Sequence, residues 1–488
     1  MLWRKSTIGC IVLGLCASLA GATNAFALNP VTSSIASFTL IAPTSEVPSG
    51  LLARAVITSG AGCPMLSGST SAGRTFALPM RLRSKPALAG AAYSALDVCE
   101  RGIPTGTDNA MVGSRVIPAT LPSRIKRIAL TGDSGCRITS LAVQNCANTS
   151  AWPLARISRN IAKDKPDVII NLGDYFYREA ECPVTDQGLC ASSPPPPGNL
   201  PVTGSAMSWI ADALIPMQPM FDAAPILMAR GNHESCARGG IGYFLFFSPQ
   251  RSTALQCAPS IVDGKVVVPS NDISPTWNAT WQVGDSDATA HTLDIEVIDS
   301  AYGGDQSVDS YAAIQRPSYV AAARRVAKGQ PDEAWLLTHR PIFGMISTQY
   351  SGGQSVWTSP NQTAASQGLL GDFNLILSSH VHVAQAVNIP NQPAQLVIGN
   401  GGTLLDPATG YETPKYGPLS NVDGSPLSPL ATPYPAPTST WTDVRFGYII
   451  ATPGTQTKSW SLEHRDERGK PFASCAVANR LAKCRTTH

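Results

Sequence analysis

A series of apolar runs that end at Gly-Asp, Gly-Asn or His constrains the fold of this chain more than any other feature. The runs occupy residues 125–131, 167–172, 225–229, 293–298, 334–338, 375–378 and 395–398. Continuous apolar runs of this length are typical of strands that are buried on both faces. Apolar residues at helical spacing over 152–163 predict a strand-helix-strand unit, and we expect further helices near 206–221 and 319–328. The pattern predicts an α/β fold.

Chemically active residues follow five of these runs. The segments are GDSG at 132–135, GDYFY at 173–177, GNHE at 231–234, LLTH ending at His339, and SHVH at 379–382. Functional groups in open α/β sheets collect at the carboxyl ends of the strands, so we expect these segments to meet. A single Gly-Asp is weak evidence because it is common in turns, and we interpret the pairs at 284–285, 304–305 and 371–372 as turns.

The side chains in these segments match the needs of a pair of metal ions. Such a pair is held by hard oxygen donors and imidazoles, with one carboxylate bridging the ions. Strand alternation would place His380 and His382 on the same side, where both could reach the centre. The sequence therefore predicts a binuclear centre whose ligands include Asp133, Asp174, Asn232, His339, His380 and His382.

The amino terminus is predicted to be a signal peptide. Arg4 and Lys5 precede an apolar stretch over 8–20, and small residues stand at Ala25 and Ala27. We expect cleavage after Ala27, which makes residues 1–27 the signal peptide. The rival interpretation is an anchor helix, but the apolar stretch is shorter than the roughly 20 residues that span a bilayer. The prediction is an exported protein, periplasmic or extracellular, with no stable membrane anchor after cleavage.

The cysteines agree with export. Cys10 and Cys16 would leave with the signal peptide, and ten others remain. An even number in an exported chain favours disulfides, although the sequence does not fix which cysteines pair. Closeness in sequence favours the pairs 63/99, 136/146, 182/190, 236/257 and 475/484. A thiolate metal ligand is the alternative role for Cys136.

The pattern of apolar and polar residues changes near residue 122. Residues 28–122 hold short apolar stretches broken by Ser, Gly and Pro, which predict a small β-rich domain, and residues 123–488 form the predicted catalytic domain. The formal net charge of +3 gives no argument for a nucleic-acid partner. The segment 405–441, dense in Pro, Ser and Thr, is expected to be a long excursion that either borders the active site or decorates the surface.

In order and spacing, the five segments resemble those of the calcineurin-like metallophosphoesterases, most closely the purple acid phosphatases. Most of that superfamily carries a histidine where this chain has Gly135, and Tyr177 stands three residues after Asp174, where purple acid phosphatases place a metal-bound tyrosinate. Ser379 and Leu336, where Gly and Val are usual, are mild departures. The resemblance implies a four-layer α/β/β/α sandwich preceded by a small β-rich domain. It also implies iron, because a tyrosinate suits Fe(III).

The resemblance also implies a role for each residue. Asp133, Tyr177 and His382 would hold Fe(III), Asp174 would bridge, and the second ion, Zn, Mn or Fe(II), would be held by Asn232, His339 and His380. His233 would contact the phosphate and protonate the leaving group, with Glu234 orienting its ring. The implied activity is hydrolysis of a small phosphate monoester by a metal-bound hydroxide, with no covalent phosphoenzyme and no nucleic acid required. Candidate phosphate clamps are Arg230, Arg238 and Arg340.

Two alternatives to a monoesterase remain open. The same metals would serve a phosphodiesterase or a nucleotidase, which a comparison of mono- and diester substrates distinguishes. The other alternative is an exported binding protein that retains a phosphatase fold without turnover. A degraded relative usually loses ligands, and here none of the expected ligands is missing.

Overall fold

The computed structural model describes residues 34–84, 93–140, 142–186, 188–190, 205–254, 256–257, 260–262, 265–267, 273–304, 308–347, 359–407, 434 and 437–487. The predicted signal peptide, 1–27, and most of the 405–441 excursion lie outside these residues. Within the described ranges, no helix combines the length and the apolar character needed to cross a membrane.

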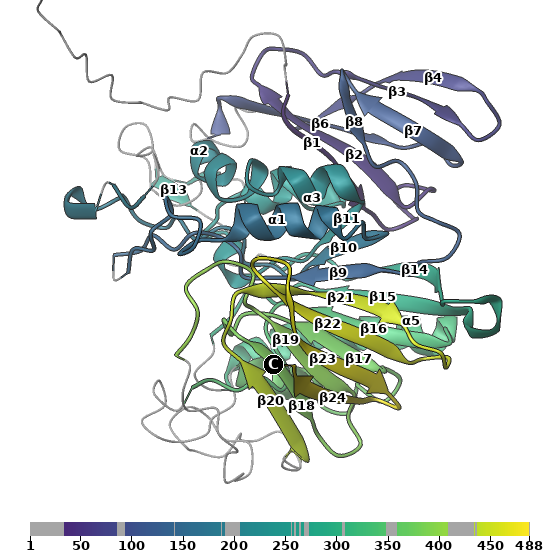
Figure 1. The fold of residues 1–488 in the computed structure, drawn as a ribbon. Coiled ribbons are helices and arrows are strands. Elements are labelled where there is room, and N and C mark those ends of the chain that lie inside the picture. Colours follow the sequence, from purple (N-terminus) through teal and green to yellow (C-terminus); the bar gives the residue numbers. More distant parts are fainter. Residues whose placement is uncertain are drawn as a thin grey trace, which may run out of the picture. The chain divides into compact units, whose positions relative to one another are not determined.

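Two sheets form the centre of the fold (Figure 1). In the larger one, β9 (Ile128–Thr131), β10 (Val168–Asn171) and β11 (Ile226–Met228) run parallel. These are the strands that the first three apolar runs predict. The eleven-stranded order is β24-β23-β22-β21-β9-β10-β11-β1-β2-β6-β5. The remaining members are β1 (Ser34–Ile41), β2 (Leu51–Thr58), β5 (Arg81–Ser84), β6 (Leu96–Gly102), β21 (Gly447–Pro453), β22 (Trp460–Asp466), β23 (Pro471–Ala478) and β24 (Leu481–Thr486).

The second sheet has seven strands in the order β14-β15-β16-β17-β19-β18-β20. Its middle strands β15, β16, β17 and β19 are parallel and correspond to the other four apolar runs. The bounds are β14 (Trp277–Val283), β15 (His291–Ile298), β16 (Glu333–Thr338), β17 (Leu375–Ser378), β18 (Ala384–Asn388), β19 (Ala394–Ile398) and β20 (Ser439–Asp443). A separate hairpin joins β12 (Ser260–Val262) to β13 (Lys265–Val267).

The inner faces of the two sheets share one apolar core. Helices lie on the outer faces (Figure 1). Leu130 and Ile170 belong to the same buried cluster as Leu293 and Leu337 of the second sheet. Full burial of each such side chain contributes about 1.5–3 kcal/mol. On the outer faces, α1 (Leu154–Lys163) and α3 (Gln218–Ala223) pack on the larger sheet, and α5 (Ser310–Gly329) and α6 (Pro360–Ser366) pack on the smaller one. The expected α/β/β/α sandwich is confirmed.

The amino-terminal region is rich in strands, as expected. Strands β3 (Met65–Thr70), β4 (Thr75–Pro79), β7 (Thr107–Val112) and β8 (Arg115–Ile117) form a four-stranded sheet. The neighbouring β1 pairs in parallel with β11, so this region also extends the larger sheet. Arg54 of β2 donates to the carbonyls of Leu245 and Phe246, both at 2.8 Å, near the end of α4 (Gly242–Phe246). The domain boundary near residue 122 stays a prediction.

One expected helix is interrupted. Where we expected a helix over 206–221, the chain forms α2 (Ala206–Trp209), a π-helical turn over Ile210–Leu214, and then α3. Pro219 lies in the first turn of α3, where a proline is tolerated, but it would break a continuous helix because it lacks an N–H donor. Helix α5 is longer than expected and begins beside Asp309, whose side chain accepts from the N–H of Tyr311 at 2.8 Å.

Candidate metal centre

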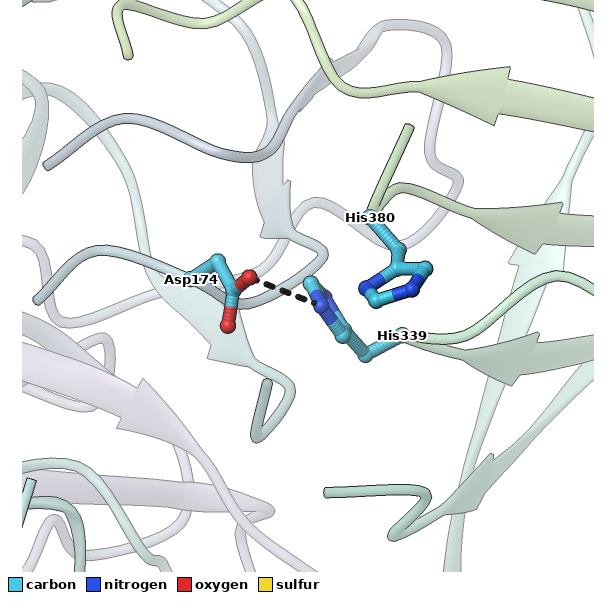
Figure 2. A group of neighbouring side chains, drawn as sticks. All are labelled: Asp174, His339 and His380. Atoms are coloured by element: carbon cyan, nitrogen blue, oxygen red, sulfur yellow. Dashed lines mark ion pairs between the residues drawn. The ribbon is translucent and has the colours of Figure 1, made fainter. Parts of the chain in front are cut away.

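The predicted ligand side chains come together between the carboxyl ends of the two sheets. Asp133 and Asp174 follow β9 and β10 of the larger sheet, whereas His339 follows β16 and His380 follows β17 of the smaller one. Figure 2 shows Asp174, His339 and His380, which offer ligand atoms that all lie within 4.8 Å of one another. Each sheet therefore contributes part of one polar cluster.

The Tyr177 hydroxyl marks one end of this cluster. Its oxygen lies 2.9 Å from Asp133 Oδ1, 3.0 Å from Asp174 Oδ2 and 2.9 Å from His382 Nε2. These are the residues that the resemblance assigns to the first ion and its bridge. One tyrosine oxygen thus lies beside two carboxylates and an imidazole.

The other end is formed around Asn232. Its side-chain oxygen lies 2.9 Å from His339 Nε2 and 2.7 Å from His380 Nδ1, and His339 Nε2 lies 3.1 Å from Asp174 Oδ2. Rotating the amide by half a turn would instead place its NH₂ group toward the imidazoles and its oxygen 2.7 Å from Arg238 Nη1. We adopt the first orientation for the metal-bound protein, because a metal ion needs the amide oxygen on the imidazole side. Asp174 contacts both ends of the cluster, as a bridging ligand must.

The chemistry of this donor set fits metal ions. Carboxylate, phenol, amide and imidazole atoms converge, and both carboxylates are almost completely buried, with Asp133 0% and Asp174 1% exposed. Burial, and the neighbouring Asp174, raise the pKa of Asp133 well above its usual range. Burial and both carboxylates likewise raise the pKa of Tyr177. A bound cation would reverse these shifts, because it favours the charged forms of its ligands.

The ring of His339 is held in the orientation that a metal ligand requires. Its Nδ1 lies 2.8 Å from the Leu172 carbonyl and 2.9 Å from the Ser379 hydroxyl. A proton on Nδ1 can be donated to that carbonyl, which leaves the lone pair of Nε2 facing Asn232 and Asp174. Ser379, a departure from the family pattern, thus contacts the ring of a predicted ligand.

The backbone at the cluster is conformationally unusual. Asp133 has φ 52°, Asp174 φ 55° and His380 φ 76°, a region that residues other than glycine seldom occupy. Such conformations persist where the surroundings enforce them, and they gather at functional sites. The segment 380–383 forms a bend, not the strand from which we expected alternation. As a result, the His380 and His382 imidazoles reach opposite ends of the cluster.

Gly135 is tied to Tyr177 by close packing. A Cβ at position 135 would lie 2.9 Å from Tyr177 Cδ2 and 2.9 Å from the Tyr175 carbonyl oxygen. Real side chains essentially never approach so closely, so a larger residue here would displace the tyrosine ring. Gly135, which stands where most of the superfamily has a histidine, and Tyr177 are therefore linked. The Tyr177 ring occupies space that a side chain at position 135 would need.

Two buried acids support the loops by accepting hydrogen bonds from backbone N–H groups. Glu234 accepts four backbone N–H groups, from Gly231 and Asp174 at 2.8 Å and from Tyr175 and Phe176 at 3.0 Å. Asp212 accepts from the N–H of Tyr177 at 2.9 Å and from Arg178 Nε at 2.6 Å. The Glu234 hydrogen bonds fix the GDYFY segment against the GNHE segment, and those of Asp212 fix it against the π-helical turn. No pattern in the sequence marks Asp212.

His233 lies beside the cluster, but its carboxylate neighbour differs from the one expected. Glu179 Oε1 lies 2.6 Å from His233 Nδ1, and Arg238 Nη2 lies 2.9 Å from His233 Nε2. Glu234, which we expected to orient this ring, points instead at the four backbone N–H groups. Burial lowers the pKa of His233 to about 4, although Asp174 and Glu179 oppose this shift. No pattern in the sequence marks Glu179 beyond its place two residues after Tyr177.

Two of the three candidate phosphate clamps make structural contacts. Arg230 Nη1 pairs with Asp299 Oδ2 at 3.1 Å. Arg340 Nε donates to the Ser300 carbonyl at 3.0 Å. Arg238 lies at the cluster and forms two hydrogen bonds with Glu179, of 2.7 and 3.0 Å.

All five expected disulfides are present, and three adjoin ligand segments. They join Cys63–Cys99, Cys136–Cys146, Cys182–Cys190, Cys236–Cys257 and Cys475–Cys484. The pairing of Cys136 removes it as a thiolate ligand. Five disulfides in one chain are typical of an oxidising compartment.

Comparisons with known proteins agree with this geometry. Residues 126–384, more than half of the chain, match the family model described as calcineurin-like phosphoesterase. A purple acid phosphatase, PPD1, from yellow lupin (Lupinus luteus) seeds has a similar fold, with a TM-score of 0.50 and 13% identity over 91% of this chain and 74% of that one. A structure of PhoD is similar with a TM-score of 0.50 and 10% identity over 93% and 92%.

No protein with a curated description matches the sequence. The family match includes every predicted ligand, from Asp133 to His382. The chain therefore belongs to the calcineurin-like phosphoesterases, a family of metal-dependent phosphoester hydrolases that typically hold a binuclear metal centre.

Proposed function

We propose that this protein is an exported phosphomonoesterase of the purple acid phosphatase type, with Fe(III) at one metal position. The observation that carries the proposal is the Tyr177 hydroxyl, which lies within 3.0 Å of Asp133, Asp174 and His382. A tyrosinate among carboxylate and imidazole ligands suits Fe(III) better than a divalent ion. The close packing of Gly135 against the Tyr177 ring supports the same assignment.

The ligand assignment follows the two ends of the cluster. Asp133, Tyr177 and His382 would hold Fe(III), Asp174 would bridge, and the second ion, Zn, Mn or Fe(II), would take Asn232, His339 and His380. When bound, the pair would polarise the phosphoryl oxygens and supply a hydroxide for in-line attack, so that no covalent phosphoenzyme forms.

Side chains of the protein would protonate the leaving group. His233 lies beside Asp174 and Asn232, where it can donate a proton to the departing oxygen. Glu179 accepts from Nδ1 and so positions the ring, whereas Arg238 Nη2, which faces Nε2 at 2.9 Å, would have to turn toward the substrate for Nε2 to carry the proton. Glu234 would act indirectly, because it fixes the backbone that carries Asp174 and His233.

Export is the second part of the proposal. It is supported by the five disulfides and by the signal-peptide pattern of residues 1–27. Cleavage after Ala27 would release the protein to the periplasm or the medium. The substrate would be a small phosphate ester, and no nucleic-acid partner is required.

A phosphate-release screen with one variant tests the function. Wild-type protein should release phosphate from phenyl phosphate faster than it hydrolyses bis(4-nitrophenyl) phosphate. Asp174→Asn should reduce kcat at least about 10³-fold with the fold retained, because the bridging position loses a charge. The matched control is Asp372→Asn, an exposed acid in another Gly-Asp pair, which should behave as wild type.

Three outcomes of this screen would contradict the assignment. A preference for the diester would make the enzyme a phosphodiesterase. Wild-type protein without turnover on either substrate would favour a binding protein on this fold. Unchanged activity in Asp174→Asn would exclude the site.

A further inference from the structure

Arg137 lies over the rings of two predicted ligands of the first ion. Its Nη2 is 3.4 Å from both ring nitrogens of His382, and its Cζ is 5.1 Å from the centroid of the Tyr177 ring. We had not counted it among the phosphate clamps. A cation is thus stacked against the Asp133 end of the cluster.

The charge of Arg137 is less compensated than that of its neighbours. Arg230 is paired with Asp299 and Arg238 with Glu179. Asp406 accepts from the His382 N–H at 3.1 Å, but in the described part of the chain no ion pair joins Arg137 to Asp406 or to another acid. Arg137 Nε is buried and has no hydrogen-bond partner among these residues. Guanidinium donors in such a position favour an anionic ligand.

The position of Arg137 is fixed by its own loop. Its N–H donates to Gln144 Oε1 at 3.0 Å, and its carbonyl accepts from the N–H of Gln144 at 2.8 Å. The Cys136–Cys146 disulfide closes the same loop. Because the backbone is already ordered, binding a ligand here costs little additional entropy.

Arg137 also lies on the solvent side of the cluster. Asp133 and Asp174 are 0% and 1% exposed, whereas Arg137 is half-buried. The scissile phosphoryl group would bind at the buried metal ligands. The rest of the substrate must extend toward solvent, where Arg137 can meet a group beyond the scissile phosphorus.

We propose that Arg137 binds a second anionic group of the substrate. The site would then prefer phosphoanhydrides, and phosphate esters that carry a carboxylate or another phosphate, over esters with a neutral leaving group. The shared chemistry is an oxyanion placed beyond the scissile phosphorus. This inference rests on the proposed function, because it assumes that the reacting phosphoryl group occupies the cluster.

A binding measurement on the metal-loaded protein tests the proposal without turnover. Methylenediphosphonate carries two anionic groups and methylphosphonate carries one, and the dissociation constant of each is measured by titration calorimetry. Wild type should prefer the diphosphonate, and Arg137→Met should reduce that preference about tenfold or more. Arg137→Lys should restore part of it. Arg74→Met, which removes an exposed arginine in a turn, should leave the preference unchanged.

A kinetic comparison distinguishes the sources of the second anion. The ratio of kcat/KM for 4-carboxyphenyl phosphate over phenyl phosphate should fall in Arg137→Met through KM if a carboxylate is accepted. If only the diphosphonate preference falls, the second anion is the neighbouring phosphate of an anhydride. Either result supports the proposal.

The inference would be overturned if Arg137→Met kept the wild-type preference for the diphosphonate. This holds whether the variant binds both phosphonates more weakly or binds both as wild type does. If wild type still hydrolyses phenyl phosphate in that case, the proposed function is retained and only the role of Arg137 is rejected. If wild type neither binds a phosphonate nor hydrolyses an ester, both fail.

Discussion

At the scale of single residues, the site depends on backbone conformations that its surroundings enforce. The left-handed Asp133, Asp174 and His380 direct their side chains into one cluster, at a cost of order 1–3 kcal/mol each. Hydrogen bonds to neighbouring segments oppose that cost: Asp174 N–H donates to Glu234, and His380 N–H donates to Asp133 at 2.6 Å. Strain of this kind indicates a site that is rigid before any ligand arrives.

Gly135→Ala tests the link between the glycine and the tyrosine. The new Cβ would contact the Tyr177 ring at 2.9 Å, so the hydroxyl should leave its position between the two carboxylates. A displacement of about 1 Å costs on the order of 10²-fold in rate, and the visible absorption of a tyrosinate–Fe(III) pair should weaken as well. Gly371→Ala is the control, because nothing lies within 4 Å of its added Cβ. A fully active, equally coloured Gly135→Ala protein would refute the link.

At the scale of elements, loops that follow different strands are joined by a few buried acids. Glu234 connects the loop after β11 to the loop after β10 through four N–H donors. An amide has only one acceptor oxygen, so a glutamine there would leave two donors facing its NH₂ group. The loops that carry Asp174 and Asn232 would then lose their shared support.

Glu234→Gln should therefore destabilise the protein by about 2–4 kcal/mol, since two buried donors lose their partner. Chemical denaturation measures the change, and metal affinity should fall with it. Glu181→Gln, at an exposed acid nearby, should change the unfolding free energy by less than about 0.5 kcal/mol. Equal stabilities of the two variants would mean that Glu234 does not support these loops.

At the scale of the whole molecule, the two sheets are joined by a buried polar contact as well as by their apolar core. Glu333 of β16 lies 2.8 Å from His291 Nε2 of β15, and it accepts from the indole of Trp460 of β22 at 3.1 Å. The two sheets each supply metal ligands, so their relative register sets the geometry of the site. The Glu333 contact between the sheets thus helps to hold the metal ligands of the two sheets in position, although it does not touch them.

This contact should depend on pH. Burial opposes a charge on His291, but its hydrogen bonds to Glu333 and to the Thr289 carbonyl raise its pKa above the ordinary value. A raised folded-state pKa gives stability that is fully present below the unfolded value, about 6.5, and is lost as pH rises through the folded one. The unfolding free energy lost in His291→Gln should therefore be larger at pH 6 than at pH 9.

His464→Gln is the control for this prediction. His464 is equally buried, and burial lowers its pKa to about 3, so it stays neutral over the same pH range. The unfolded chain binds a proton at this residue near pH 6.5 and the folded protein does not, so the free energy lost in His464→Gln should be smaller at pH 6 than at pH 9, the opposite trend to His291→Gln. A pH-independent effect of His291→Gln would contradict the ion pair.

The sequence predicted the parts of the molecule that depend on local pattern. Continuous apolar runs identified β9, β10 and β11, and the motif order located the ligands at their ends. The neighbour of His233 could not be predicted, because Glu179 and Glu234 are both acids close to a motif and only the folded loops decide which one reaches the ring. Asp212 was missed for a different reason: it is distant in sequence from the motifs and lies in a helical segment.

The metal content of purified, active protein tests the central claim most directly. Elemental analysis should find about two metal ions per chain, one of them iron, with a visible absorption band that Tyr177→Phe removes. An active protein that contains fewer than two ions per chain, or that is colourless and free of iron, would contradict the proposed centre.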